Sequence, residues 1–186
     1  QSSKPKLGKP PSFVSKVFES LNNIDGIVPI DNFVLKKSCE YMLENPHSVI
    51  EPHYLFSSEQ DDNPSQSDVM DAIKVLESDS YISVSYHSGG ADNWGCHYRP
   101  TLHGFQTFCE NYIKGFDHLI DRIAGALVNE EADTNEDLSK LLDVSTYLTE
   151  HVMKLFENND LLKLTEYSCG LTRAYSLSPK LRRAIS

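Results

Sequence analysis

The sequence has no long apolar run and no complete motif of a known catalytic site. No stretch approaches the roughly 20 apolar residues that span a bilayer, and no signal-peptide core is present. We therefore expect a protein of the cytoplasm, or of the nucleus in a eukaryote, with no membrane segment. A phosphate-binding glycine loop, a Gly-x-Ser-x-Gly elbow and a dinucleotide fingerprint are also missing, which argues against an enzyme.

Cysteines are few, and no two of the four form a Cys-x-x-Cys pair. Scattered cysteines in a reducing compartment are expected to be free thiols. Cys96 and His97 are adjacent, with His87 and Cys109 nearby in the sequence, but this spacing matches no zinc pattern. Adjacent ligands also suit a single tetrahedral ion poorly. We expect neither a metal nor another cofactor.

The whole chain has a net charge of −10, and positive charge is scarce between its two ends. Residues 13–112 contain 5 basic and 15 acidic side chains, and residues 113–179 contain 6 basic and 12 acidic ones. A nucleic-acid-binding protein usually presents a basic face, so this distribution weakens a DNA-binding interpretation. Only the two ends are basic. Residues 1–12 form an arm in which we expect no packed structure.

Apolar residues recur mostly at helical spacing, which predicts a mainly helical α+β protein. We expect a short strand or extended segment at residues 27–30. Ser67 is the expected N-cap of one helix, and Thr134 or Asn135 that of another. Alternating residues on either side of a polar turn predict two β-hairpins. The expected helices are 13–21, 31–43, 50–56, 68–77, 102–128 with a break at Gly115, 138–142 and 144–157, and the expected strands are 81–86, 94–99, 161–164 and 174–177.

An internal repeat appears when the chain is shifted by 80 residues. The stretch from Lys74 to Ile82 then falls on the stretch from Lys154 to Leu162. Both read as the end of a helix, an apolar residue followed by Glu, a polar turn and the start of a strand. The two copies predict the same arrangement twice, namely two helices with a tight turn followed by a hairpin.

This order of elements resembles the winged-helix superfamily, in the form found in MarR-like bacterial regulators. The resemblance covers about residues 33–110 and 116–186. It implies two winged-helix modules, 13–112 with its N-terminal helix and 113–186, joined by a helical connector. The alternative is a pair of generic α+β modules.

The repeat also predicts which faces of the second helix in each copy point inward. We expect four core residues in each copy: Val69, Ala72, Ile73 and Leu76, and Thr149, Val152, Met153 and Phe156. In a DNA-reading winged helix, the opposite face enters the major groove. The first copy places Asp68 and Asp71 there, and phosphates repel both carboxylates.

In the second copy, the outward face combines polar residues with leucines: Tyr147, Leu148, His151, Lys154 and Leu155. The two leucines suit a protein interface. If the helical register differs by one residue, they belong to the core instead. The exposed cations of its wing and C-terminal end could contact a phosphate backbone or simply be solvated. The candidate DNA- or partner-binding residues are Ser145, Thr146, Tyr147, Leu148, His151, Lys154, Leu155, Lys163, Arg173, Lys180, Arg182 and Arg183.

Two functions follow from these features. The first is a DNA-associated regulator whose second module contacts DNA while the first binds a partner or a second copy. The second is a non-catalytic interaction subunit without direct DNA contact, because acidic tandem winged-helix subunits of this architecture occur in chromosome-segregation complexes. The charge distribution favours the second function, and the prevalence of DNA binding among winged-helix proteins favours the first. From the sequence we expect the DNA-associated transcription regulator, with the interaction subunit as the alternative.

Overall fold

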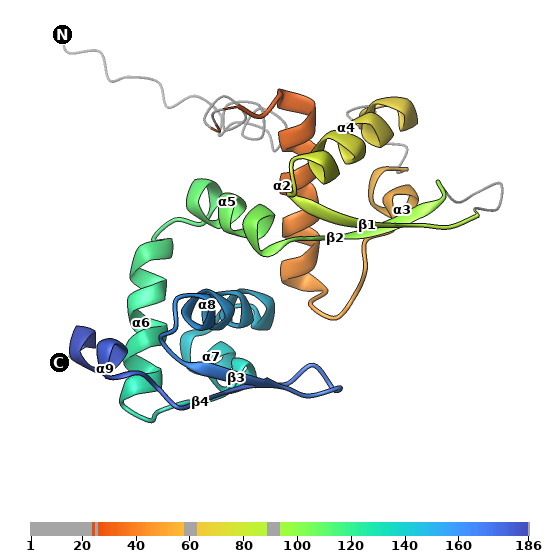
Figure 1. Cartoon of the computed structure of the whole chain (residues 1–186). Helices are drawn as coiled ribbons and strands as arrows, with labels where there is room; N and C mark the ends of the chain where they lie inside the picture. The colour runs from red at the N-terminus through yellow and green to blue at the C-terminus, as the bar shows by residue number, and fades with distance from the viewer. Residues whose placement is uncertain (1–23, 25, 58–62, 89–93, 186) are drawn as a thin grey trace, which may run out of the picture.

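In the computed structural model, which describes residues 24, 26–57, 63–88 and 94–185, the chain is mostly helical with two small antiparallel hairpins. Its elements fall into a first half (α2 to α5) and a second half (α6 to α9), which are separate groups in Figure 1. In the described part of the chain, no helix is both long and apolar enough to cross a membrane. The expected helix at 13–21 lies outside the described residues.

The first half comprises four helices and one hairpin. Its hairpin pairs Ser83 with Arg99 and Val84 with Tyr98. On the other edge of β2, Ile50 and Tyr98 exchange two backbone hydrogen bonds of 2.8 and 3.0 Å. The elements are α2 (Pro29–Glu44), α3 (Pro52–Phe56), α4 (Gln66–Ser78), β1 (Ile82–Tyr86), β2 (Cys96–Pro100) and α5 (Leu102–Tyr112).

In the second half, as in the first, an initial helix is followed by two helices, a hairpin and a final helix. A single bridge between Thr134 and Arg173 joins the start of α7 to β4. The predicted break at Gly115 is confirmed, since this residue has a φ of +75° between α5 and α6. The elements are α6 (Phe116–Val128), α7 (Asn135–Leu142), α8 (Thr146–Asn158), β3 (Lys163–Glu166), β4 (Thr172–Tyr175) and α9 (Pro179–Ile185).

Side-chain caps explain where several helices begin. Thr134 accepts a hydrogen bond from the Asp137 N–H at the start of α7, as predicted. The prediction of Ser67 as a cap is wrong, because Ser65 accepts from the Asp68 N–H and α4 begins at Gln66. The expected extended segment at 27–30 is also shorter than predicted. A proline at the first helical position is already compatible with helical φ, and α2 begins at Pro29.

The turns that follow α4 and α8 have the same backbone geometry. Ser80 and Asp160, which are 80 residues apart, both have positive φ, 63° and 56°. Each is followed by a residue whose N–H donates to a carbonyl five residues earlier, Tyr81 to Leu76 and Leu161 to Phe156. The left-handed residue ends each helix and directs the chain into its hairpin.

Buried apolar side chains form one continuous core that includes residues of both halves. Tyr98 is fully buried, and its hydroxyl lies 2.6 Å from Ser38 Oγ, which connects β2 to α2. Gly104 lies against the backbone of Tyr81, where an added Cβ would overlap the carbonyl group. This close approach fixes α5 on β1 and requires glycine at that position.

Candidate functional site

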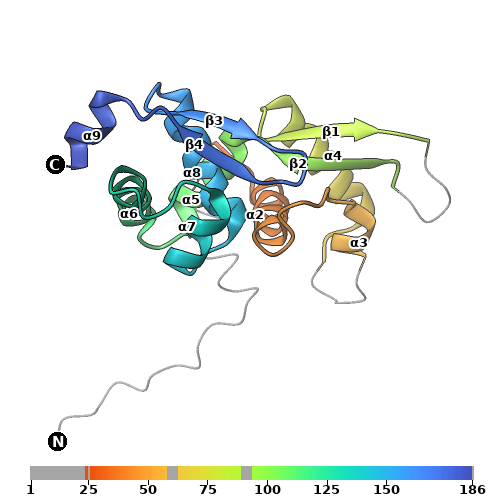
Figure 2. The same ribbon diagram turned by 90° about the horizontal axis from the view of Figure 1, so that it is seen from below.

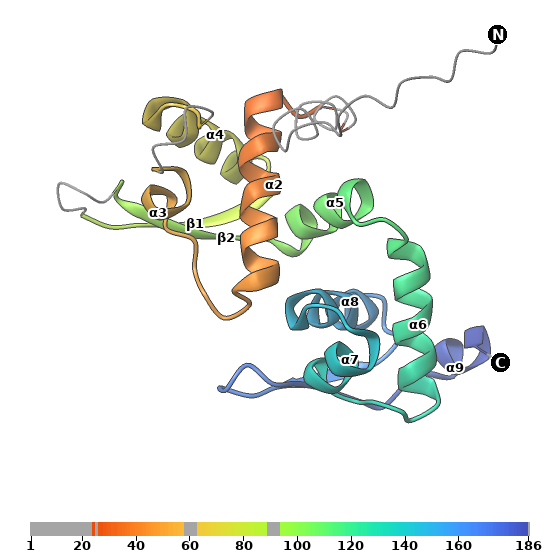
Figure 3. The same cartoon turned by 180° about the vertical axis from the view of Figure 1, so that it is seen from behind.

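The N-terminal part of α8 packs directly on the first half, below the ends of α2 and α5 in Figure 3. Ser145 Oγ donates a 2.6 Å hydrogen bond to the carbonyl oxygen of Leu43, the last-but-one residue of α2. The rings of Tyr147 and Phe105 meet edge to face, with centroids 4.7 Å apart. These contacts place the helix of the second half that sequence analysis singled out inside the chain itself.

His151 is the polar centre of this contact. Its ring lies 4.8 Å from that of Phe105, and its Nε2 lies 2.8 Å from Gln106 Oε1. Because an amide oxygen only accepts, Nε2 carries the hydrogen and donates it. Burial, and secondarily the charge of Lys154, lowers the pKa of His151 to about 4. His151 is therefore a neutral, hydrogen-bonded residue in this contact at pH 7.

The predicted register of α8 is confirmed for the core face, and on the opposite face it is wrong for two residues. Thr149, Val152, Met153 and Phe156 are buried, as expected. Leu148 and His151, predicted to point outward, are each only 5% exposed. The reason is that α8 is covered on two sides, by its own half and by the first half. A pattern interpreted for one buried face cannot reveal the second cover.

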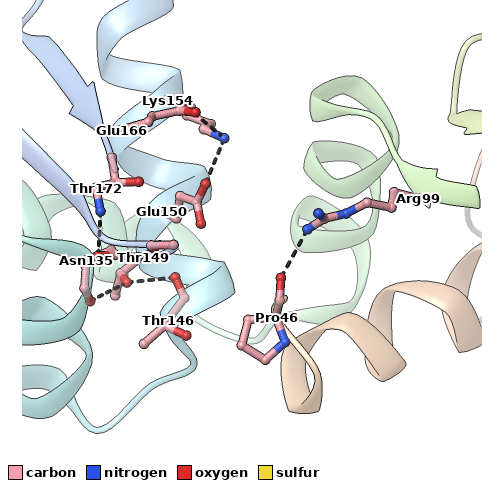
Figure 4. A network of polar contacts seen from close by, with 10 residues as sticks. Pro46, Arg99, Asn135, Thr146, Thr149, Glu150, Lys154, Glu166 and Thr172 are labelled. Carbon is pink, nitrogen blue, oxygen red and sulfur yellow. Dashed lines mark hydrogen bonds and ion pairs between the residues drawn. The ribbon is translucent and has the colours of Figure 1, made fainter. Parts of the chain in front are cut away.

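Lys154 lies at the rim of the contact and is already paired. Its Nζ is 2.7 Å from Glu150 Oε1 and 3.2 Å from Glu166 Oε1, as Figure 4 shows. Burial opposes the charged form, but the hydrogen bonds and charges of the two carboxylates raise the pKa of Lys154 overall. The cation of α8 is thus neutralised by two anions and presents no net positive charge.

Arg99 closes the rim from the first half. Its guanidinium donates a 3.0 Å hydrogen bond to the Pro46 carbonyl oxygen, on the opposite side of Figure 4 from Lys154. It also lies 5.9 Å from the centre of the Tyr147 ring. Burial, the largest cause, raises the pKa of Tyr147 to about 12, so its hydroxyl stays protonated. The arginine is exposed, and its position beside the Tyr147 ring adds a cation–π contact between the halves.

A cavity of about 390 Å³ opens at this rim. Its lining includes two cations, Arg99 and Lys154, and two carboxylates, Glu150 and Glu166. Because charges of both signs line it and already engage protein partners, the cavity offers no site of a single sign.

The other candidate residues are distributed over different elements. Thr146 and Leu155 are half-buried on α8, and Thr146 accepts a 3.0 Å hydrogen bond from Thr149. Arg173 is exposed but pairs with Asp133, at 3.4 Å. Helix α9 packs on α6 at the end of the molecule away from the first half (Figure 1). The candidate cations outside α8 are all exposed, and they are Lys163, Arg173, Lys180, Arg182 and Arg183.

The first half contributes partners that sequence analysis missed. Gln106 and Leu43 make the hydrogen bonds described above, and Phe105 lies within the helix expected at 102–128. Gly170, at the tip of the second hairpin, lies against the His47 ring, where an added Cβ would overlap. No local pattern identifies a residue whose partner lies more than 40 positions away, such as Gln106 for His151.

Chemistry at the cysteines is limited by their surroundings. Cys39, Cys96 and Cys109 are buried, and burial raises the pKa of each thiol. In the ranges that the structure describes, no three His, Cys, Asp or Glu side chains are arranged to bind a metal ion. Among the described residues, the contact between the halves has the most specific side-chain geometry, through the hydrogen bonds of Ser145 and His151 and the ring contact of Tyr147. We take this contact as the candidate functional site.

Substituting Ser145 tests whether the contact between halves contributes to stability. Ser145→Ala removes an N-cap acceptor and the hydrogen bond to Leu43, so we expect a loss of about 2 kcal/mol in the free energy of unfolding. Ser65→Ala removes an exposed cap and an exposed hydrogen bond to Asp68 Oδ2, and should cost about 1 kcal/mol. Urea denaturation measures both. Equal losses would contradict the additional role of Ser145.

The pKa of His151 predicts a pH dependence of stability. Below pH 6.5 the unfolded chain takes up a proton at this histidine, whereas the folded chain does not until about pH 4. The folded state should therefore lose up to about 3 kcal/mol as pH falls through this window. Unfolding free energies measured from pH 7 to 4 should fall more steeply in wild type than in His151→Gln, in which the other titrating groups are unchanged. Parallel curves would contradict this assignment.

Comparison with known proteins does not add to this geometry. No family model, no curated protein and no solved structure matches the chain.

Proposed function

We propose that the chain is a non-catalytic interaction module built from two winged-helix units. The order of elements supports this, since two helices, a hairpin and a helix follow an initial helix in each half. The bridges from Ile50 to Tyr98 and from Thr134 to Arg173 occupy the place of the short first strand of a winged helix in each hairpin. The matching turns at Ser80 and Asp160 support the 80-residue repeat.

The observation that carries the proposal is the burial of α8 against the first half. In a DNA-reading winged helix, the outward face of this helix enters the major groove. Here Tyr147 and His151 on that face contact Phe105 of α5, and Lys154 is paired with two carboxylates. A helix face used within the chain is not available to bases. Protein contact is the function that this arrangement favours.

The corresponding helix of the first half, α4, leaves its outer face uncovered among the described residues. Asp68 and Asp71 are exposed there, and the Val75 side chain is 44% exposed. Lys74, the only cation of α4, pairs with Asp71 at 3.5 Å. An acidic face with an apolar residue repels phosphate and suits a basic protein surface. We assign the partner-binding role to α4.

Charge reversal on α4 tests this role. Affinity capture with the full chain from extracts of its source cells should recover a partner that the D68K/D71K variant loses almost completely. D117K/D121K is the matched control, because it reverses two exposed carboxylates in the first turns of α6. It should retain the partner. The proposal fails if both variants bind the same proteins as wild type, or if both lose them equally.

A second candidate function is phosphate contact through the exposed cations of the second wing and α9, namely Lys163, Arg173, Lys180, Arg182 and Arg183. If the chain binds DNA by this route, affinity should fall with salt, and the salt slope should shrink by about 3 in the R173A/R182A/R183A variant. Lys154→Ala should leave the slope unchanged, since Lys154 is neutralised by Glu150 and Glu166. Fluorescence anisotropy with a short duplex measures this. Absence of binding at low salt would exclude the candidate.

A further inference from the structure

The backbone of β1 has one edge that the hairpin does not use. At one end of the hairpin the Thr101 N–H donates to the Tyr81 carbonyl oxygen, and at the other the His87 N–H donates to that of Gly95, each at 3.0 Å. In an antiparallel pair such bonds recur at every second residue. The N–H and C=O groups of Ile82, Val84 and Tyr86 therefore point away from β2.

The other hairpin edges are each engaged at one such position. Ile50 pairs with the free side of β2 at Tyr98. On β3, the Leu164 N–H donates a 2.9 Å hydrogen bond to Glu157 Oε1. The equivalent residue 80 positions earlier, Glu77, accepts instead from the Tyr86 hydroxyl at 2.7 Å. Among the described residues, none bonds to the backbone of Val84, and β1 forms the outer edge of its hairpin in Figure 2.

We propose that β1 pairs with β1 of a second copy, antiparallel, about a two-fold axis through Val84. In this register Val84 faces Val84 of the second copy, and Ile82 faces Tyr86. Three N–H and three C=O groups on each strand then find partners in one set of hydrogen bonds. An open strand edge is the usual template for such pairing.

Charge selects a second copy as the occupant. The chain carries a net charge of −10, but residues 80–86 contain no charged side chain. The register places Ser83 opposite Ser85 on the exposed face, so no like charges meet. On β3, by contrast, Lys163 and Glu166 are charged, and Glu166 is bound to Lys154. Only the first hairpin thus combines an open edge with a neutral, self-complementary strand among the described elements.

The test uses the full chain and exposed positions, so that folding is preserved. In S83K/S85K, the lysine introduced at position 83 faces the lysine introduced at position 85 of the second copy. In S83E/S85E, two carboxylates face each other in the same way. Sedimentation velocity up to about 1 mM chain follows the mass, because a short edge pairing is expected to be weak. T165K is the control, since with native Lys163 it gives β3 the same two lysines.

Wild type and T165K should shift with concentration from 21.0 kDa toward twice that mass. Each charged double variant should raise the dissociation constant about tenfold or more, and an equimolar mixture of the two should restore it. A wild type that remains at 21.0 kDa throughout would overturn the proposal. So would a dimer that persists unchanged in both double variants, because it would form through another surface.

Discussion

The packing of α8 between two layers is the constraint on which the rest of the structure depends. One face carries Val152 and Met153 into the core of its own half, and the other carries Tyr147 and His151 onto α5. Polar groups placed in such a contact must keep their hydrogen bonds, or they lose more free energy than the packing provides. Gln106 satisfies His151, and the Leu43 carbonyl satisfies Ser145. The two halves are thereby fixed in one orientation by directional bonds as well as by area.

This constraint also limits what the second half can bind. For α8 to enter a DNA groove, the halves would have to separate, exposing the Phe105 and Tyr147 rings and leaving Ser145 without its acceptor. The freed face would carry one cation, Lys154, which Glu150 and Glu166 already neutralise. Separation would therefore cost the apolar contact without creating a basic surface. The acidic composition and the buried helix support the same interaction function.

Sequence analysis predicted the elements well where the determinants are local. The repeat placed four core residues correctly in each copy, because helical periodicity depends only on spacing. Local alternatives caused the small errors. Ser65 and Ser67 are both good caps. Each strand of the second hairpin lies two residues nearer the tip than expected, because Leu161 completes the turn after α8. The outward face of α8 was misassigned because its cover comes from α2 and α5, and no local pattern contains that information.

The two hairpins show how one residue can decide whether a strand edge stays open. An equivalent glutamate is the last-but-one residue of α4 and of α8, Glu77 in the first half and Glu157 in the second. In the second half, position 166 is a glutamate that pairs with Lys154, so Glu157 accepts from the Leu164 N–H.

In the first half, the position 80 residues earlier is Tyr86, whose hydroxyl donates a hydrogen bond to Glu77. The lysine equivalent to Lys154 is Lys74, which pairs with Asp71 instead. A tyrosine in place of a glutamate therefore redirects the protecting carboxylate and leaves the Val84 N–H available. The turns after α4 and α8 keep the same backbone geometry, and the two hairpins differ in side-chain pairing, which binds the Leu164 N–H and leaves the Val84 N–H open.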